Sequence, residues 1–170
     1  YLRKYLYDSD KDKIMARIVG FINGDGTIYK SKTGLLTASF FGEKIDLEAI
    51  CFDINKLYGT SYKPYFKSRS TKSETWCFCV NSKITNDIVR LGGIIGKKTE
   101  QLFFIPEWIL HHSDKLVRKE FIGGLYGAEG SSRKPLNYST HSLSMYMTLI
   151  SDLMLRQIQN ILEVEFKIQA

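Results

Sequence analysis

Two acidic residues, Asp25 and Glu129, lie near the ends of two stretches of the chain that follow the same pattern. The stretches run from Ile18 to Gly26 and from Ile122 to Gly130, and each reads apolar, small, Gly, apolar, apolar, variable, small, acid, Gly. A repeat of this length and unusual composition indicates two copies of one structural unit. Because glycine commonly follows the end of a helix, each copy is expected to present one carboxylate at a helix C-terminus.

Small residues four positions apart share one face of a helix, and each stretch has such a face: Gly20 with Gly24, and Gly124 with Ala128. Faces of this kind let two helices pack at close range, which would bring the two acids together. Neighbouring carboxylates repel each other unless they are protonated or bridged by cations. Shared divalent metal ions would relieve this repulsion and support phosphodiester cleavage. Mg²⁺ suits such oxygen ligands, and the sequence has no His or Cys cluster that would indicate zinc.

The basic residues are segregated along the chain, whose net charge is +6. The segments 26–42, 61–73 and 130–146 hold eight Lys and Arg residues and neither Asp nor Glu. Segment 43–59 reverses the sign, with four acidic residues against two lysines. Such segregation is typical of a protein that binds a polyanion. Charge alone leaves an ordinary solvated surface as the alternative.

Apolar periodicity and turn residues predict the elements of the first unit in the order helix, two strands, helix, two strands, helix. The first predicted helix starts at Asp10 or Asp12 and is ended by Gly24 and Gly26, the second is 44–58, and the third is capped by Asn81 or Ser82 and stopped by Gly92-Gly93. The predicted strands are 27–30, 35–42, 61–70 and 74–80. Ser113 is expected to cap the second motif helix. A shift of 104 positions then predicts a helix over 148–162 and a strand over 164–168. This second copy lacks counterparts of residues 67–92, so we expect a fragment or a domain of a larger polypeptide.

Alternation along the strands predicts one sheet face for DNA and one for the core. Residues 63, 65, 67 and 69 would share the DNA face of their strand, while Thr37 and Ser39 would share that of strand 35–42. Strand ribbons of this kind can enter the major groove. The candidate DNA-binding residues are Lys30, Lys32, Thr37, Ser39, Lys63, Tyr65, Lys67, Arg69, Arg133 and Lys134.

Length and composition narrow the class of protein. With 170 residues, 44% of them hydrophobic, the chain can bury a core as one domain or two half-domains. It has no apolar run of membrane-spanning length and no signal peptide, which favours an intracellular protein. Its three cysteines lack the spacing of a metal site and are expected to be reduced.

The two motif stretches resemble those of the LAGLIDADG homing endonucleases, in their single-chain form with two pseudosymmetric halves. The resemblance extends to the segment between them, through Gly96-Lys97-Lys98, then Ile105-Pro106-Glu107-Trp108-Ile109 and the approach Phe121-Ile122-Gly123-Gly124-Leu125. It covers residues 11–170. Similar domains occur in inteins and as free-standing enzymes.

This resemblance implies an α+β fold of two αββαββα half-domains, packed through the motif helices, with antiparallel sheets that form a DNA-binding saddle. The halves would be residues 1–112 and 113–170, the second incomplete, in a monomer that is part of a larger polypeptide or stands alone. The implied activity is a double-strand break across the minor groove of a long DNA target. Asp25 and Glu129, with the preceding Gly24 and Ala128, would form the Mg²⁺ or Mn²⁺ site.

One departure from the family pattern concerns the basic residue that often stands two positions before the Ile-Pro pair. Here that position holds Phe103, so Lys97 or Lys98 would have to organise the active-site water. Two other classes of function stay open at this point. One is a non-cleaving DNA- or RNA-binding relative, such as a maturase or regulator, and the other is a structural module with solvated basic strands.

Overall fold

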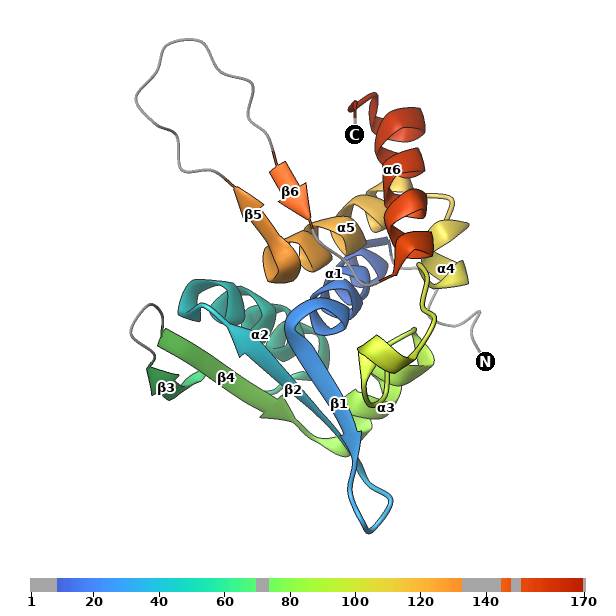
Figure 1. Ribbon diagram of the computed structural model, residues 1–170. Coiled ribbons are helices and arrows are strands. Elements are labelled where there is room, and N and C mark those ends of the chain that lie inside the picture. The colour runs from blue at the N-terminus through green and yellow to red at the C-terminus, as the bar shows by residue number, and fades with distance from the viewer. Residues whose placement is uncertain (1–8, 70–73, 133–144, 148–150, 170) are drawn as a thin grey trace, which may run out of the picture.

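Figure 1 shows the computed structural model of the chain, which describes residues 9–69, 74–132, 145–147 and 151–169. The first unit has the predicted order of elements, helix, two strands, helix, two strands, helix. These elements are α1 (Ser9–Asp25), β1 (Gly26–Lys30), β2 (Leu36–Gly42), α2 (Lys44–Tyr58), β3 (Tyr65–Arg69), β4 (Glu74–Val80) and α3 (Ser82–Arg90).

The four strands form one antiparallel sheet in the order β1-β2-β4-β3. The inner face of the sheet is apolar, and Ala38, Phe40 and Phe78 on it are at most 1% exposed. The rings of Phe40 and Phe78 stack with centroids 4.6 Å apart. Helices α1, α2 and α3 cover this face (Figure 1). Ala38 and Phe40 of β2 therefore face the core.

The second unit repeats the start of the first. A connector with one turn of 3-10 helix, η2 (Lys98–Glu100), and the short helix α4 (Glu107–Leu110) leads to α5 (Lys115–Glu129). The antiparallel strands β5 (Gly130–Ser132) and β6 (Met145–Met147) and the helix α6 (Asp152–Phe166) follow. The predicted α+β fold is confirmed.

Two boundaries in the second unit differ from the prediction. Helix α6 starts four residues later than predicted, because the Ser151 hydroxyl caps it by accepting the N–H of Met154 at 3.2 Å. The predicted strand 164–168 is wrong, since α6 continues to Phe166. Glu165 in this last turn forms an ion pair with Arg118 of α5 at 2.8 Å, which favours the helix over an extended strand.

Two smaller corrections concern where elements begin. The cap of α5 is Asp114 rather than Ser113, because the Asp114 carboxylate accepts the N–H of Leu116 at 2.9 Å. Strand β3 starts at Tyr65 rather than at residue 61. The side chain of Asn55 binds both the N–H and the C=O of Tyr62, at 2.7 and 2.9 Å, and so ties that residue to α2 instead.

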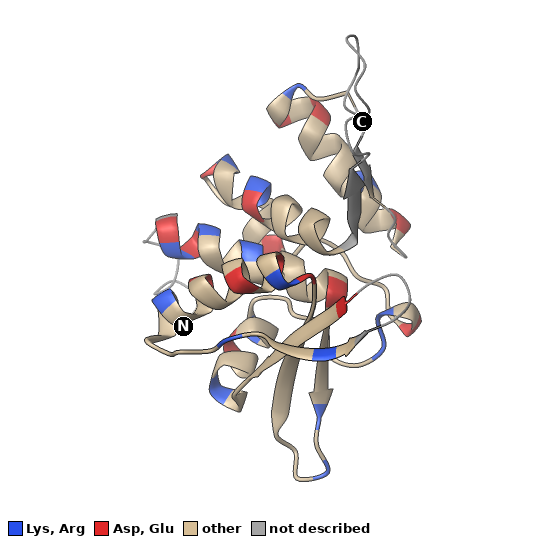
Figure 2. Cartoon of the chain, turned by 90° about the vertical axis from the view of Figure 1, so that its left-hand side faces the viewer, with Lys and Arg blue, Asp and Glu red and all other residues tan. Residues whose placement is uncertain are grey.

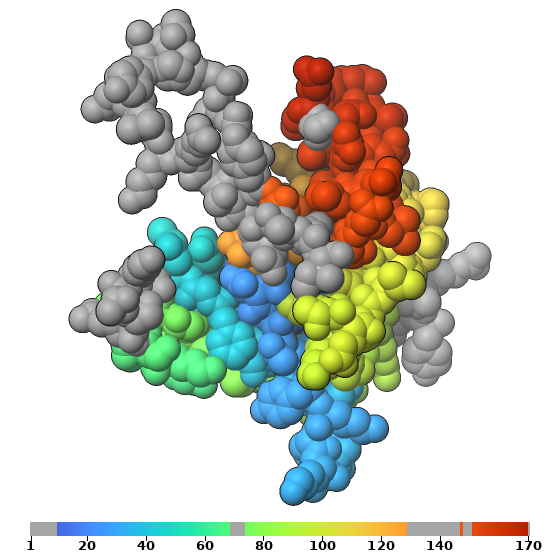
Figure 3. Space-filling model, viewed as in Figure 1, coloured from blue at the N-terminus to red at the C-terminus, as the bar shows by residue number. Residues whose placement is uncertain are grey.

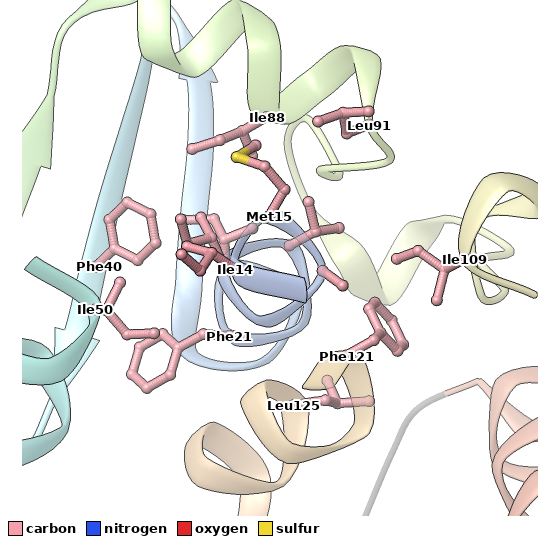
Figure 4. Close-up of a cluster of buried hydrophobic side chains, with 14 of the residues drawn as sticks. Ile14, Met15, Phe21, Phe40, Ile50, Ile88, Leu91, Ile109, Phe121 and Leu125 are labelled. Atoms are coloured by element: carbon pink, nitrogen blue, oxygen red, sulfur yellow. The ribbon is translucent and has the colours of Figure 1, made fainter. Parts of the chain in front are cut away.

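Helix α1 is buried from two sides, by the sheet and by α5. Figure 4 shows Phe121 and Leu125 of α5 pointing toward α1 from the side away from Phe40. Contact between α1 and α5 is the most extensive of any two elements in the described part of the chain. Arg17 of α1 reinforces it with ion pairs to Glu120 of α5 at 2.8 Å and to Asp53 of α2 at 2.9 Å.

Glycines set the closeness of these two helices. A Cβ on Gly20 would collide with the carbonyl oxygen of Phe121 and lie 2.9 Å from the backbone nitrogen of Leu125. A Cβ on Gly124 would likewise collide with the carbonyl of Arg17. The helices therefore touch backbone to backbone, as the small-residue faces of the motifs predict.

We expect Gly124→Ala to lower the free energy of unfolding by about 1–3 kcal/mol, because the added methyl group must push the backbones apart. Gly123 is the matched control, since it lies one position earlier on the same helix and a Cβ there would meet nothing within 4 Å. Gly123→Ala should stabilise the helix by up to about 1 kcal/mol through propensity alone. Chemical denaturation measures both, and equal effects would contradict the close helix contact.

Candidate active site and nucleic-acid interface

The two motif acids occupy equivalent positions, since Asp25 is the last residue of α1 and Glu129 is the last residue of α5. The helices that carry them are in backbone contact one turn and more earlier, at Gly20 and Gly124. The side chain of Glu129 lies outside the described part of the structure. The closeness of the two carboxylates therefore stays a prediction. Among the described residues no three His, Cys, Asp or Glu side chains form a metal cluster.

The Asp25 side chain is exposed at the end of a buried helix. Surrounding protein atoms raise the pKa of its carboxyl group above the ordinary value of 3.8, and the nearby ammonium of Lys98 opposes part of that rise. The preceding Gly24 is buried, while Ala128 before the second acid is partly buried. A partly desolvated carboxylate with access to solvent is a suitable ligand for a hard divalent cation.

The structure separates the two lysine candidates. Lys98 is half-buried and its ammonium donates a hydrogen bond to the carbonyl oxygen of Gly24, beside Asp25. Lys97 points elsewhere, since it is exposed and pairs with Glu100 at 2.8 Å. Lys98 alone of these two lysines therefore contributes charge to the end of α1.

The position that is basic in the resembled family, Phe103, has a different role here. Its side chain is only 8% exposed and belongs to the core. Its carbonyl oxygen accepts a hydrogen bond from the hydroxyl of Ser151, which docks the connector on the start of α6. Lys98, which precedes Phe103 by five residues, lies near the acid because the connector runs beside β1. There the N–H of Gly96 donates to the carbonyl of Ile28 at 2.8 Å.

The outer face of the sheet carries some of the predicted DNA-binding residues. Tyr65 and Lys67 are exposed, as are Lys30 and Lys32 at the β1–β2 hairpin. This hairpin projects from the body of the protein (Figure 3). Basic residues mark the β1–β2 hairpin and β3, and β4 begins with the acid Glu74, whereas both signs of charge occur along the helices (Figure 2).

The predicted alternation along β3 is wrong at both ends. Lys67 is an extra residue at an irregularity between Phe66 and Ser68, so the backbone register that sets Arg69 opposite Glu74 is shifted from the one at Tyr65. Lys63 precedes the strand and lines a hollow of about 500 Å³ beside α2, together with Lys44 and other residues. An added residue changes which face the following side chains occupy, and the period of two does not reveal it.

Two more predicted residues lie on the outer face of β2. Thr37 is half-buried, but Ser39 is buried, and its hydroxyl lies 3.2 Å from the sulfur of Cys79. Ser39 therefore supports the surface rather than presenting a free hydroxyl. Arg133 and Lys134 lie outside the described residues.

Sequence reasoning missed the contribution of Phe41 to this face. The ammonium of Lys67 lies over the Phe41 ring, 4.3 Å from its centroid, in a cation–π contact. The Tyr65 hydroxyl lies 4.0 Å from the sulfur of Cys79 on the neighbouring strand. The alternation that places Thr37 and Ser39 outward also places residue 41 there, so the signal was present in the sequence.

Solved structures of homing endonucleases share this fold. The chain aligns with I-DmoI in complex with DNA and Mn at a TM-score of 0.56 and 19% identity, covering 90% of this chain and 77% of that one. Mesophilic variants of the homing endonuclease I-DmoI align with a TM-score of 0.57 and 18% identity, covering 91% and 77%. I-WcaI bound to its DNA recognition sequence aligns at a TM-score of 0.56 and 16% identity, covering 91% of this chain and 68% of that one. The resemblance of the sequence motifs is confirmed at the level of the fold.

Sequence relatives are long proteins that match over a small part of their length. From Methanocaldococcus jannaschii, replication factor C small subunit is 33% identical over 145 residues, 82% of this chain and 8% of the relative. The tRNA-splicing ligase RtcB of that organism is 33% identical over 171 residues, which cover 92% of this chain and 17% of the relative. Its DNA-directed RNA polymerase subunit Rpo1N is 31% identical over 148 residues, 79% and 11%. No protein-family model matches the chain. Within the described residues, no helix has the length and apolar character needed to cross a membrane.

We expect Asp25→Asn to raise the melting temperature in EDTA at pH 7. The raised pKa means that the folded state binds the Asp25 proton more tightly than the unfolded state, so ionisation of this carboxyl lowers stability as pH rises. Asparagine removes that cost. The gain should fade as pH falls below about 3.8, where the carboxyl is protonated in both states. Melting curves from pH 3 to 7 measure it, and a variant that is less stable at pH 7 would contradict the shift.

Proposed function

We propose that this chain, which has the fold of the LAGLIDADG homing endonucleases, is a metal-dependent endonuclease that cuts double-stranded DNA at a long, specific site. The observation that carries the proposal is the pair of motif helices, in backbone contact and each ending at an acid. The similar proteins I-DmoI and I-WcaI were solved with DNA. A protein that acts on DNA also agrees with an intracellular location.

The residues at the end of α1 suit Mg²⁺ or Mn²⁺. Asp25 offers carboxylate oxygens, and its raised pKa shows that the bare negative charge is disfavoured where it stands. Glu129, at the equivalent end of α5, would supply the second carboxylate, with Gly24 and Ala128 preceding the two acids. A divalent ion bound there would supply Lewis-acid stabilisation of the phosphodiester under attack.

Lys98 would supply a positive charge beside that metal site. Its ammonium stands at the Gly24 carbonyl, next to Asp25, and is half-buried. In this position it would orient the attacking water and stabilise negative charge that develops on the phosphate. Intact acids in both motifs and a lysine already in place favour cleavage over the alternative, a non-cleaving DNA- or RNA-binding maturase or regulator.

The outer face of the first sheet would bind the DNA. Its exposed residues include Tyr65 and Lys67, with Lys30 and Lys32 exposed at the β1–β2 hairpin, and the helices pack on the opposite face. Lys67 lies over the Phe41 ring, which limits the freedom of its side chain before DNA arrives. Lysines in such a position would contact phosphates, while the groove edges of bases would be read by other side chains of the strands.

The relatives suggest how such a domain comes to lie in a larger protein. The chain spans 8%, 17% and 11% of three relatives with different names, and the matched segments are of similar length. A unit shared by otherwise different proteins is typical of an inserted segment. We therefore assign the chain to a mobile insertion of the intein type, with its DNA target at the insertion site.

Cleavage of DNA that carries the flanks of its own insertion site tests the proposal. With Mg²⁺ or Mn²⁺ the protein should cut both strands, and EDTA should abolish the reaction. Asp25→Asn should abolish cleavage while DNA binding persists, because one negative charge near the phosphates is removed. Lys98→Ala should slow single-turnover cleavage about 100-fold.

Lys97→Ala is the matched control for Lys98→Ala. It removes the adjacent lysine, whose partner is Glu100, and should change the rate less than about 2-fold, below a 0.5 kcal/mol effect on the barrier. Specific binding without cleavage under every metal condition would leave the non-cleaving regulator as the function.

The DNA-binding face is tested by salt dependence. If Lys67 contacts a phosphate, Lys67→Ala should reduce the slope of log affinity against log salt by about 0.9. Lys56 on α2 is the control, since it is exposed on a helix behind the sheet. Lys56→Ala should leave the slope unchanged. A reduced slope for Lys56→Ala and an unchanged one for Lys67→Ala would place DNA on the helical side.

A further inference from the structure

Asn23 lies in the last turn of α1, two residues before Asp25, and is 3% exposed. Its side-chain amide makes two hydrogen bonds with the backbone of the connector. The nitrogen donates to the carbonyl of Gly92 at 3.1 Å, and the oxygen accepts the N–H of Ile94 at 3.1 Å. The amide places its donor and its acceptor on two separate atoms, so neither an ionised Asp nor Ala can replace both bonds.

The connector continues from these two bonds directly to the active-site lysine. Ile95 bridges to Ile28 of β1, and the N–H of Gly96 donates to the Ile28 carbonyl at 2.8 Å. The side chain of Gln101 closes the turn by donating to the carbonyls of Ile95 and Lys97, at 2.7 and 3.0 Å. Lys98, directly after Lys97, donates a hydrogen bond from its ammonium to the Gly24 carbonyl.

The connector is therefore hydrogen-bonded to α1 twice, first by the side chain of Asn23 and then, through Lys98, by the carbonyl of Gly24. Two parts of the connector, Gly92 to Ile94 and Lys98, are thus fixed on the helical turn that carries Asp25. The second motif has no equivalent, because Gly127 stands at the position of Asn23, and a Cβ there would meet nothing within 4 Å. The paired hydrogen bonds of this asparagine are therefore specific to the first half of the protein.

We propose that Asn23 is a positioning residue that holds the connector so that Lys98 stands beside Asp25. The inference rests on the proposed endonuclease function, and it adds a role for the variable position of the first motif. Displacement of a catalytic group by about 1 Å can cost about 100-fold in rate, so loss of the two bonds should reduce the rate of cleavage rather than DNA affinity.

The sharpest variant is Asn23→Asp, which keeps the size of the side chain and the acceptor for Ile94 but loses the donor to Gly92. Asn55→Asp is a matched control. Asn55 binds one backbone N–H and one C=O of Tyr62 in the same way, on α2 and away from Lys98. A general cost of placing a carboxylate at such a site would therefore appear in both variants.

We expect Asn23→Asp to slow single-turnover cleavage at saturating DNA about 10-fold or more, with DNA affinity changed less than about 2-fold. Asn55→Asp should leave that rate unchanged. In a Lys98→Ala background, Asn23→Asp should cost little more, because residues that act through one group are not additive. An equal loss of rate in the wild-type and Lys98→Ala backgrounds would overturn the inference.

Hydrogen exchange of the connector amides gives a readout that needs no cleavage. Asn23→Asp should speed exchange at Ile94 and Gly96 about 10-fold or more, while Asn55→Asp should not. Unchanged exchange in Asn23→Asp would overturn the inference even if the wild-type protein cuts DNA. Failure of the wild-type protein to cut its insertion-site DNA would instead overturn the proposed function, and the faster exchange would then show a purely structural clamp.

Discussion

The backbone contact between α1 and α5 determines where everything else in the protein stands. At Gly20 and Gly124 the backbone of the other helix occupies the space that a side chain would need, so the two motif helices lie closer than side chains would allow. The first sheet covers α1 from the other side, which buries Ile18 and Val19 completely. Arg17 then ties α1 to α2 and α5 through Asp53 and Glu120. The position of each acid follows from this arrangement of helices.

The ends of these helices are an unfavourable place for acids. The C-terminus of a helix carries partial negative charge, so a carboxylate there is disfavoured by the helix dipole as well as by partial burial. Partial burial raises the pKa of the Asp25 carboxyl group. Lys98 offsets part of it, from a connector that folds back on β1. Acids retained at such positions are typical of binding or catalysis rather than of stability.

Side-chain amides organise the two segments that leave the helices. Asn23 fixes the start of the connector, and Asn55 fixes the approach to β3. In each case one asparagine satisfies a donor and an acceptor of irregular backbone, which would otherwise be left without partners. Local hydrogen bonds from these two amides thus help to hold the connector that carries Lys98 and the approach to strand β3.

The sequence by itself determined the repeated unit, the order of its elements and the two acids, because periodicity and glycine placement are local properties. The family resemblance of the sequence also named Lys97 and Lys98 as candidates for the site. Only the tertiary structure separated them, since the path of the connector across β1 brings Lys98 to the Gly24 carbonyl. The tertiary structure also decided that the register of β3 shifts at Lys67 and that residues 164–166 are helical. The extra residue appears only when β3 is paired with β4, and the ion pair from Glu165 to Arg118 joins segments far apart in the sequence. Local patterns record neither.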